Sequence, residues 1–406
     1  MNVLHLNQSD IGGGAAIAAY RLHQGLLAKG VESRLLVGAK KTSSDRVAVV
    51  PRQLKIEAQL SRLNRIPSLN YLNVISSFNL PQHPFFQEAD VLNLHNLHTG
   101  YFNYLAIPKL AAAKPTVWTL HDLWAFTGHC SHPYDCDRWK IGCGKCPYPD
   151  TYPAIQRDNT SIEWRLKRWA SHQSPLAIVT PSHWLMQRAQ QSLLGDLPIH
   201  RIPHGIDVEI YAPLETEQCR FVLGIPKGKK VLMFAAENLS DPYKGINLLL
   251  QSLAKLPASL KAELFLLILG NGGEAIAKAA DIENLHLGYT SSDRVKCIAY
   301  SAADLFLIPT QADVFSLVAL EAMACGTPSV SFAVGGVGDL IRPSVTGYLA
   351  QPGDTTDFSR GILQLWEDDT LRDRLSQNCR AIAVSEYSLE LQAKRYIQLY
   401  QQLLSS

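Results

Sequence analysis

Short apolar runs alternate with longer segments of helical periodicity from one end of the chain to the other. The runs typical of β-strands lie at Val3–Asn7, Ser33–Val37, Val91–Leu94, Thr116–Leu120, Ala177–Thr180, Val231–Ala235, Leu264–Leu269, Leu305–Ile308 and Ser329–Phe332. Strands that are apolar at nearly every position are buried on both faces, and helices between them indicate that they are parallel. The pattern therefore predicts an α/β protein.

The strand pattern is interrupted once, near the middle of the chain. Residues 201–207 form a loop with proline and glycine, and a new series of strands and helices starts at Val231. A chain of 406 residues is also long for a single hydrophobic core. We predict a Rossmann-like domain at residues 1–205, a second one at residues 206–385, and a terminal helix at residues 386–406 that packs back across the junction.

A glycine-rich turn follows the first strand. Residues 12–14 are glycines, and a helix is predicted directly after them at residues 15–29. Free N–H groups at a helix N-terminus attract anions, so Gly13 and Gly14 are candidates for contact with a phosphate group. An NAD site would need an acidic residue after the second strand, and that strand ends in two lysines. An NAD site is therefore not favoured, and a simple tight turn remains the alternative.

An acidic pair lies where a strand ends and a helix begins in the second half of the chain. The helix is predicted to start near Ser316, so the N–H groups of Ser316 and Leu317 suit a diphosphate. Glu321, in the second helical turn, can accept hydrogen bonds from ribose hydroxyls. Asp313, in the preceding loop, can accept them from the hydroxyls of a sugar. The alternative is that Asp313 is a surface-loop or capping residue and that Glu321 is solvated.

Four of the eight cysteines fall in one loop of the first half, at Cys130, Cys136, Cys143 and Cys146. Four thiolates close together suit a tetrahedral metal ion, and the last two have the spacing of a zinc knuckle. We predict a structural zinc ion that fixes this loop. Free thiols or two disulfides are the alternative.

Charge and composition restrict the function further. The chain is 47% hydrophobic and 18% charged and has a formal net charge of +2, so it has no basic field suited to nucleic acid. The N-terminus lacks the regions of a signal peptide. The longest apolar run, Leu264–Leu269, is far shorter than the roughly 20 residues of a membrane helix. We predict a cytoplasmic enzyme.

Two basic amphipathic stretches lie in the first half of the chain. Residues 52–65 carry four basic side chains among spaced apolar ones, and residues 164–169 combine two tryptophans with three basic residues. Such a combination suits an anionic membrane, so peripheral contact with the inner face of the membrane is one interpretation. Two ordinary amphipathic helices packed on the domain are the other.

The acidic pair carries a family resemblance. Asp313 and Glu321 are separated by seven residues and lie ahead of an Ala-Met-Ala-Cys-Gly-Thr-Pro run. This segment resembles the acidic signature of the family 4 retaining glycosyltransferases with the GT-B fold, in which the first position is usually Glu. The segments that match further motifs of the family are residues 203–207, 241–245, 269–273 and 335–336. The resemblance implies two Rossmann-like domains with parallel sheets that face each other across a cleft.

The resemblance also implies a function. It indicates retaining transfer of a sugar from a UDP- or GDP-sugar to a glycan or lipid-linked acceptor, by front-face attack and without a catalytic cofactor. The N-terminal domain would hold the acceptor and the C-terminal domain the donor. The cysteine-rich loop is similar to one in a subgroup associated with surface-polysaccharide synthesis of the colanic-acid type. A nucleotide-sugar epimerase or glycan phosphorylase of the same fold and a catalytically silent sugar-binding relative are the alternatives.

The resemblance assigns roles to individual residues as well. Lys244 would neutralise the departing diphosphate, Asp313 would contact the donor sugar, and His121 would lie near its reacting centre. His95 and His98, at the end of another predicted strand, would line the acceptor side. The family normally pairs its lysine with an arginine at the end of the preceding strand, and residues 235–238 contain none, so Lys244 acts alone or the role of the arginine moves elsewhere, for example to Arg294.

Overall fold

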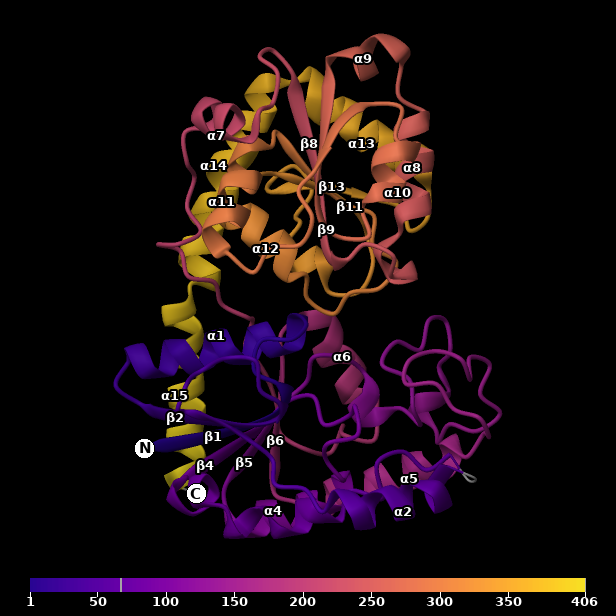
Figure 1. Cartoon of the computed structure of the whole chain (residues 1–406), viewed down its shortest axis with the longest axis vertical. Coiled ribbons are helices and arrows are strands. Elements are labelled where there is room, and N and C mark those ends of the chain that lie inside the picture. Colours follow the sequence, from indigo (N-terminus) through magenta and orange to yellow (C-terminus); the bar gives the residue numbers. More distant parts are fainter. Residues whose placement is uncertain (66–67, 406) are drawn as a thin grey trace. The chain divides into compact units, whose positions relative to one another are not determined.

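The computed structural model describes residues 1–65 and 68–405, and the side chains of Asn64 and Arg65 are outside the described part. The chain forms two compact units (Figure 1). The N-terminal unit contains Met1–Gly205 and Glu390–Ser406, and the C-terminal unit contains Ile206–Leu389. The first unit is therefore built from two separate segments of the chain.

The N-terminal unit contains a parallel sheet of seven strands in the order β3-β2-β1-β4-β5-β6-β7. The strands are β1 (Asn2–Ser9), β2 (Glu32–Ala39), β3 (Val47–Val49), β4 (Val91–Leu94), β5 (Thr116–Thr119), β6 (Leu176–Thr180) and β7 (Ile199–Arg201). The helices are α1 (Gly14–Ala28), α2 (Leu54–Arg65), α3 (Pro84–Glu88), α4 (Ile107–Ala113), α5 (Thr160–His172), α6 (His183–Gln190) and α15 (Leu389–Ser405). The strand order reverses between β1 and β4, and the carboxyl ends beside such a reversal are the usual ligand site.

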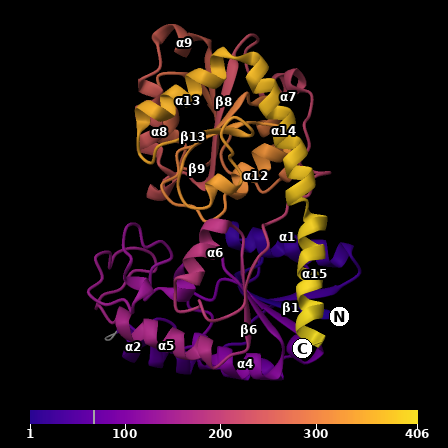
Figure 2. The same cartoon turned by 180° about the vertical axis from the view of Figure 1, so that it is seen from behind.

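The terminal helix α15 belongs to the core of the N-terminal unit. Its residues Tyr396 and Tyr400 are fully buried in one apolar cluster with Leu22 of α1 and residues of β1, β4, β5 and β6. Figure 2 shows α15 lying along this sheet. The Tyr400 hydroxyl accepts a hydrogen bond from Asn93 Nδ2 at 2.8 Å, and the Tyr396 hydroxyl is 3.0 Å from Thr119 Oγ1. The helix therefore covers the sheet and also satisfies polar groups of β4 and β5.

The C-terminal unit has a parallel sheet of six strands in the order β10-β9-β8-β11-β12-β13. The strands are β8 (Lys230–Asn238), β9 (Leu264–Asn271), β10 (Glu283–His286), β11 (Leu305–Ile308), β12 (Ser329–Phe332) and β13 (Gly347–Ala350). The helices are α7 (Thr216–Leu223), α8 (Ile246–Ala254), α9 (Ala258–Glu263), α10 (Glu274–Ala279), α11 (Asp293–Ala302), α12 (Leu317–Ala324), α13 (Thr355–Glu367) and α14 (Asp369–Tyr387).

Both faces of the second sheet are buried, which explains its apolar strands. Val231 and Met233 of β8 pack in a cluster with α11, α12 and α14, whereas Leu232 and Phe234 pack in a second cluster with α8 and α13. Successive side chains of a strand point to opposite faces, so each face receives every second residue. The α/β class and the parallel sheets predicted from the sequence are confirmed.

Every predicted strand is present, and four further strands were not predicted. These are β3, β7, β10 and β13. All four are short and lie at or near a sheet edge, and β10 is half exposed with the polar sequence Glu-Asn-Leu-His. Strands β7 and β10 lack the continuous apolar run that marks a strand buried on both faces, whereas β3 (Val-Ala-Val) and β13 (Gly-Tyr-Leu-Ala) are only three and four residues long.

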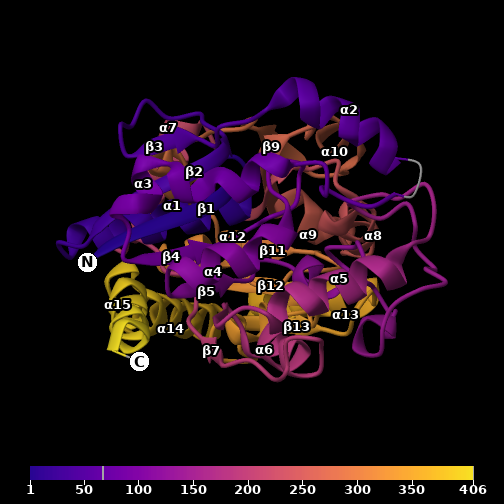
Figure 3. The same cartoon turned by 90° about the horizontal axis from the view of Figure 1, so that it is seen from below.

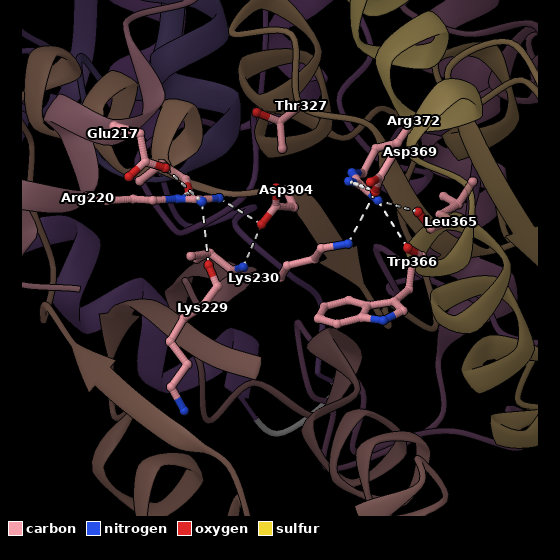
Figure 4. Close-up of polar contacts among 12 residues, drawn as sticks. Glu217, Arg220, Lys229, Lys230, Asp304, Thr327, Leu365, Trp366, Asp369 and Arg372 are labelled. Atoms are coloured by element: carbon pink, nitrogen blue, oxygen red, sulfur yellow. Dashed lines mark hydrogen bonds and ion pairs between the residues drawn. The ribbon is translucent and has the colours of Figure 1, made fainter. Parts of the chain in front are cut away.

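A set of polar contacts closes the edge of the second sheet where β8 and β11 begin (Figure 4). Arg220 of α7 bonds Asp304 Oδ2 at 2.7 Å and the Ala302 carbonyl at 3.0 Å. The same carboxylate oxygen accepts a hydrogen bond from Val231 N at 2.7 Å. On the other side, Lys230 Nζ is 3.2 Å from Asp369 Oδ1. These contacts hold the edge opposite the carboxyl ends of the strands.

Candidate active site

The loop that carries Lys244 is fixed against the loop that follows β11. Gly245 has a φ of +71°, and a Cβ atom at this position would lie 1.9 Å from the Pro309 carbonyl oxygen, so only glycine fits. The Tyr243 carbonyl accepts hydrogen bonds from Gln311 N at 2.8 Å and from Thr310 Oγ1 at 3.0 Å. Because β8 and β11 are neighbours, the two loops leave the same edge of the sheet together.

Asp313 lies where this pair of loops meets a third one. Its carbonyl accepts a hydrogen bond from Gly336 N at 2.9 Å, and a Cβ atom on Gly335 would lie 1.9 Å from the same carbonyl oxygen. The carboxylate oxygen Oδ1 accepts a hydrogen bond from Phe315 N at 3.1 Å. The structure gives the second carboxylate oxygen no partner among the described residues. The loops after β8, β11 and β12 thus support one another around a half-buried Asp313.

Helix α12 begins where the sequence predicts. Ser316 is its N-cap residue and accepts a hydrogen bond from Ala319 N at 3.4 Å, and Leu317 is its first residue. Glu321 is only 4% exposed, and its Oε2 accepts a hydrogen bond from the Tyr300 hydroxyl at 3.1 Å. The alternative of a solvated Glu321 is therefore wrong. The carboxylate is held in place by a tyrosine from α11, which the sequence alone did not indicate.

Lys244 is half-buried, and its ammonium group has no hydrogen-bond or ion-pair partner among the described residues. The strand before it ends in Glu237 and Asn238, both exposed, so β8 does not supply the arginine that the family normally has at this strand end. Arg294, at the start of α11, is exposed. The structure therefore brings Lys244, Asp313 and the start of α12 to one edge of the C-terminal sheet.

The glycine turn of the N-terminal unit is tied to the loop after β2. Gly13 has a φ of +88° and is the N-cap residue of α1. The buried Asp10 carboxylate accepts hydrogen bonds from Ile11 N, Lys41 N and Thr42 N at 3.0, 2.9 and 2.8 Å. Burial raises the pKa of Asp10, but these hydrogen bonds outweigh it, so the pKa lies below its usual value. The turn presents the N-terminus of α1 at the same edge as the residues that follow β4 and β5.

Buried histidines gather at this edge. His121 follows β5, and its Nε2 is 2.9 Å from His95 Nδ1. His95 Nε2 is in turn 2.9 Å from His5 Nδ1, and the His204 ring stacks on His121 with 5.1 Å between ring centroids. Burial lowers the pKa of His5 to about 3 and the pKa of His121 to about 4. His5 and His204 were not identified from the sequence, because neither residue differs there from an ordinary core or loop histidine.

His98 forms a separate pair with Asp122. His98 Nε2 is 2.8 Å from Asp122 Oδ2, and His98 Nδ1 is 3.4 Å from the Tyr152 hydroxyl. Burial raises the pKa of Asp122, but His98 and Trp124 N outweigh burial, so the pKa lies below its usual value. The residue types and the strand ends pointed to His95, His98 and His121. Asp122 could have been identified as a further candidate only from its position directly after His121.

The cysteine-rich loop contains free thiols. Gly128 N donates a hydrogen bond to Cys143 Sγ at 3.2 Å, and His129 Nε2 is 3.2 Å from Cys146 Sγ. Two disulfides are therefore not present. The described part of the chain holds no group of three or more His, Cys, Asp or Glu side chains arranged for a metal ion, Cys130 and Cys136 included. The arrangement does not fit zinc as it stands, and the structural zinc ion stays a prediction.

The two basic stretches form α2 and α5, which lie on the same side of the N-terminal unit (Figures 1 and 3). Arg52 is not a free surface cation, because it forms an ion pair with the buried Glu57. Lys167 is buried as well, and its Nζ donates hydrogen bonds to the carbonyls of Trp124 and Thr127 at 2.7 and 3.0 Å. Both cations therefore have structural partners and are not available to a membrane.

Part of α5 is nevertheless exposed and basic. Trp169 is 51% exposed, and Arg165 and Arg168 are exposed beside it. These residues line a surface cavity of about 580 Å³ together with Trp164 of the same helix. Ile141, at the rim, is 88% exposed. Of the residues that the structure describes, no helix has the length and apolar character to cross a membrane.

Two family models match the chain, one in each half. "Glycosyltransferase Family 4" matches residues 12–210, and "Glycosyl transferases group 1" matches residues 215–382. The two matched ranges correspond closely to the two units of the fold.

Two curated relatives and one solved structure illustrate the similarity. The putative colanic acid biosynthesis glycosyl transferase WcaC of Escherichia coli (strain K12) is 25% identical over 99% of this chain and 100% of its own length. The N-acetyl-alpha-D-glucosaminyl L-malate synthase of Bacillus anthracis is 27% identical, but the match covers only 59% of this chain and 62% of that protein. The structure of Anabaena Alr3699/HepE in complex with UDP-glucose superposes with a TM-score of 0.70, at 18% identity, over 99% of this chain and 100% of that one.

The matches agree with the geometry of the two units. Each unit is a parallel α/β sheet with candidate ligand groups at the carboxyl ends of its strands, and the acidic pair lies in the strand–loop–helix context that its motif requires. The chain therefore belongs to the family 4 glycosyltransferases and has the GT-B fold.

Proposed function

We propose that this glycosyltransferase moves a sugar from a nucleotide-diphosphate sugar to a hydroxyl of a glycan or lipid-linked acceptor, with retention, in polysaccharide biosynthesis. The observation that carries the proposal is the set of mutually supported loops around Asp313 in the C-terminal unit. They bring an unpaired cation, a carboxylate and a helix N-terminus to one edge of the sheet.

The donor fits these groups by its charge. The N-terminus of α12 and the Lys244 ammonium attract the diphosphate, and the ammonium neutralises charge that develops on the leaving group. The buried Glu321 carboxylate, oriented by Tyr300, accepts hydrogen bonds from the ribose hydroxyls. The free oxygen of Asp313 accepts one from a sugar hydroxyl. A UDP-sugar is the first candidate, because the Anabaena relative binds UDP-glucose, and a GDP-sugar is the second.

Retention follows if the acceptor attacks the face that the diphosphate leaves. The bond between the anomeric carbon and the phosphate oxygen breaks, and the acceptor oxygen bonds the same face of that carbon. The acceptor proton passes to the departing phosphate oxygen, so no protein nucleophile is required. The anomeric configuration of the product, read by NMR, tests retention directly.

The acceptor side and the membrane contact are assigned to the N-terminal unit. His95 and His98 are the candidates for the acceptor side, and Asp122 orients the His98 ring. The exposed Trp169 and its neighbouring arginines fit an anionic lipid surface, where a lipid-linked acceptor would reside. The enzyme would then act in the cytoplasm, at the inner face of the membrane.

A thermal-shift panel of UDP, GDP, ADP and CDP tests the donor site. We expect one nucleotide to raise the melting temperature of the wild type more than the others, because the proposed donor carries that nucleotide. Glu321→Gln should weaken the binding of that nucleotide roughly ten- to hundredfold, since the neutral amide is a weaker hydrogen-bond acceptor than the carboxylate. Glu263→Gln is the matched control, because Glu263 is exposed at the opposite edge of the same sheet. If no nucleotide shifts the wild type, the donor site is wrong.

Slow hydrolysis of the sugar nucleotide separates the transferase from the other functions of the fold. A transferase hydrolyses its donor slowly without acceptor, whereas a silent relative binds it without turnover. An epimerase would return a different sugar nucleotide, and a phosphorylase would require inorganic phosphate.

A further inference from the structure

Three imidazole rings form a hydrogen-bonded chain across neighbouring strands of the N-terminal unit. His5 lies on β1, His95 follows β4 and His121 follows β5, and these three strands are adjacent in the sheet. His5 Nδ1 is 2.9 Å from His95 Nε2, and His95 Nδ1 is 2.9 Å from His121 Nε2. His5 is 0% exposed and His95 is 2% exposed, so the chain runs from the core of the sheet to its ligand edge.

All three rings are neutral at pH 7. Burial lowers the pKa of His5 to about 3 and of His121 to about 4, and burial also places the pKa of His95 well below its usual value. A neutral imidazole has one N–H donor and one acceptor nitrogen. Each ring of the chain therefore has to donate in one direction and accept from the other.

This requirement leaves two arrangements. In the first, every ring carries its proton on Nδ1, so His5 donates to His95 and His95 donates to His121. In the second, every ring carries its proton on Nε2, and both hydrogen bonds run from His121 towards His5. One ring cannot change its tautomer without the others.

The inner end of the chain decides between the two arrangements. His5 Nε2 is buried and has no partner among the described residues. The second arrangement would place an N–H group there, and buried N–H groups without an acceptor are rare and costly. The first arrangement leaves only an acceptor lone pair unsatisfied. The geometry therefore favours the arrangement with the protons on Nδ1.

We propose that His5 and His95 are positioning residues that hold His121 in its Nδ1–H tautomer, so that His121 can donate a hydrogen bond to a sugar hydroxyl at the carboxyl edge of the N-terminal sheet. His121 Nε2 is occupied by His95, whereas its Nδ1 has no partner among the described residues and the side chain is partly exposed. The His204 ring, stacked at an interplanar angle of 15°, fixes the ring plane. The identity of the ligand rests on the proposed function, but the tautomer does not.

The tautomer can be measured without any ligand. In the ¹⁵N NMR spectrum of histidine-labelled protein at pH 7, protonated and unprotonated ring nitrogens have well separated shifts. We expect Nδ1 of His5, His95 and His121 to be protonated and Nε2 of each to be unprotonated. Replacement of single rings assigns the signals among the 13 histidines. A proton on Nε2 of His121 overturns the proposal.

A matched pair of variants links the tautomer to sugar recognition. In His95→Asn the side-chain amide N–H₂ takes the place of Nδ1 and can still donate to His121 Nε2. In His95→Asp a carboxylate takes that place, and it can only accept, so it forces the proton of His121 onto Nε2. We expect the Asp variant to bind UDP-glucose roughly tenfold more weakly than the Asn variant, with equal affinity for UDP.

The outcomes distinguish this inference from the proposed function. If the wild type does not bind UDP-glucose, the proposed donor is wrong, and the tautomer measurement still decides the histidine chain. If the two variants differ in the tautomer of His121 but bind UDP-glucose equally, its role towards the sugar is overturned. Equal affinity for UDP, together with native tryptophan fluorescence, shows that both variants are folded.

Discussion

Lys244 lies on a loop at the carboxyl edge of the C-terminal sheet, and its ammonium group has no hydrogen-bond or ion-pair partner among the described residues. Its loop is fixed by Gly245 and by the two hydrogen bonds to the Tyr243 carbonyl, so the backbone that carries Lys244 is held in place. The family's arginine partner is missing from residues 235–238. In the proposed reaction Lys244 should therefore contribute much of the electrostatic stabilisation of the leaving diphosphate.

Replacement of Lys244 tests this role. We expect Lys244→Ala to lower kcat roughly 10²- to 10³-fold, because the charge of the departing diphosphate is no longer neutralised. Lys244→Arg should recover part of the rate, since it restores the charge with a different shape. Lys227→Ala, at an exposed position before β8, is the control. Full activity of Lys244→Ala, measured as donor hydrolysis, would contradict the assignment.

The same residues show what a sequence can and cannot reveal. The positions of Asp313, Ser316 and Glu321 follow from a strand, a loop and a helix that are adjacent in sequence, and the structure has these elements. The Tyr300 hydroxyl on Glu321 comes from a different helix, and nothing in the local sequence marks it. The contact between His5 and His95 could not be predicted for the same reason, because it joins two strands that are distant in sequence.

At the scale of elements, burial decides which strands can be predicted. The central strands are buried on both faces and therefore carry continuous apolar runs. The edge strands are less buried, because β10 has the polar sequence Glu-Asn-Leu-His with no buried residue and the two middle residues of β13 are half-exposed. In helix α5 the sequence pattern does not reveal burial. The pattern is amphipathic, but Lys167 is buried against carbonyl groups, and its Nζ lies 3.7 Å from the Trp124 ring centroid. Periodicity cannot distinguish such a lysine from a solvated one.

The exposed side of α5 gives a prediction about membranes. We expect the protein to sediment with vesicles that contain anionic lipid and not with neutral ones, because Arg165 and Arg168 flank the exposed Trp169. Reversing both charges (Arg165→Glu and Arg168→Glu) should weaken binding at least tenfold, since each basic residue near such a surface contributes about 1 kcal/mol.

The tryptophan is tested with a matched aromatic residue. Trp169→Ala should also weaken vesicle binding, whereas Phe221→Ala should not, although Phe221 of α7 is 81% exposed. Equal sedimentation of the wild type with neutral and anionic vesicles would contradict a membrane role for α5.

At the scale of the whole molecule, the two units differ in their titratable groups. The N-terminal unit contains every histidine of the chain except His286, and several of these histidines are buried. It also contains every tryptophan except Trp366. The tryptophans therefore report mainly on the unit that holds the buried imidazoles.

Acid should consequently unfold the N-terminal unit first. The pKa values of His5 and His121 are lowered by burial to about 3 and about 4, whereas the same side chains in an unfolded chain titrate near 6.5. The unfolded state then binds more protons, so the stability that these neutral rings provide above pH 6.5 is lost as the pH falls towards 4. Each such histidine lowers the free energy of unfolding by about 1.4 kcal/mol per pH unit in this range.

We expect the tryptophan fluorescence transition in urea to move to lower urea concentration between pH 7 and pH 5, while the stabilisation of the C-terminal unit by a bound nucleotide persists. A fluorescence midpoint that is constant over this range would show that the rings are not held neutral.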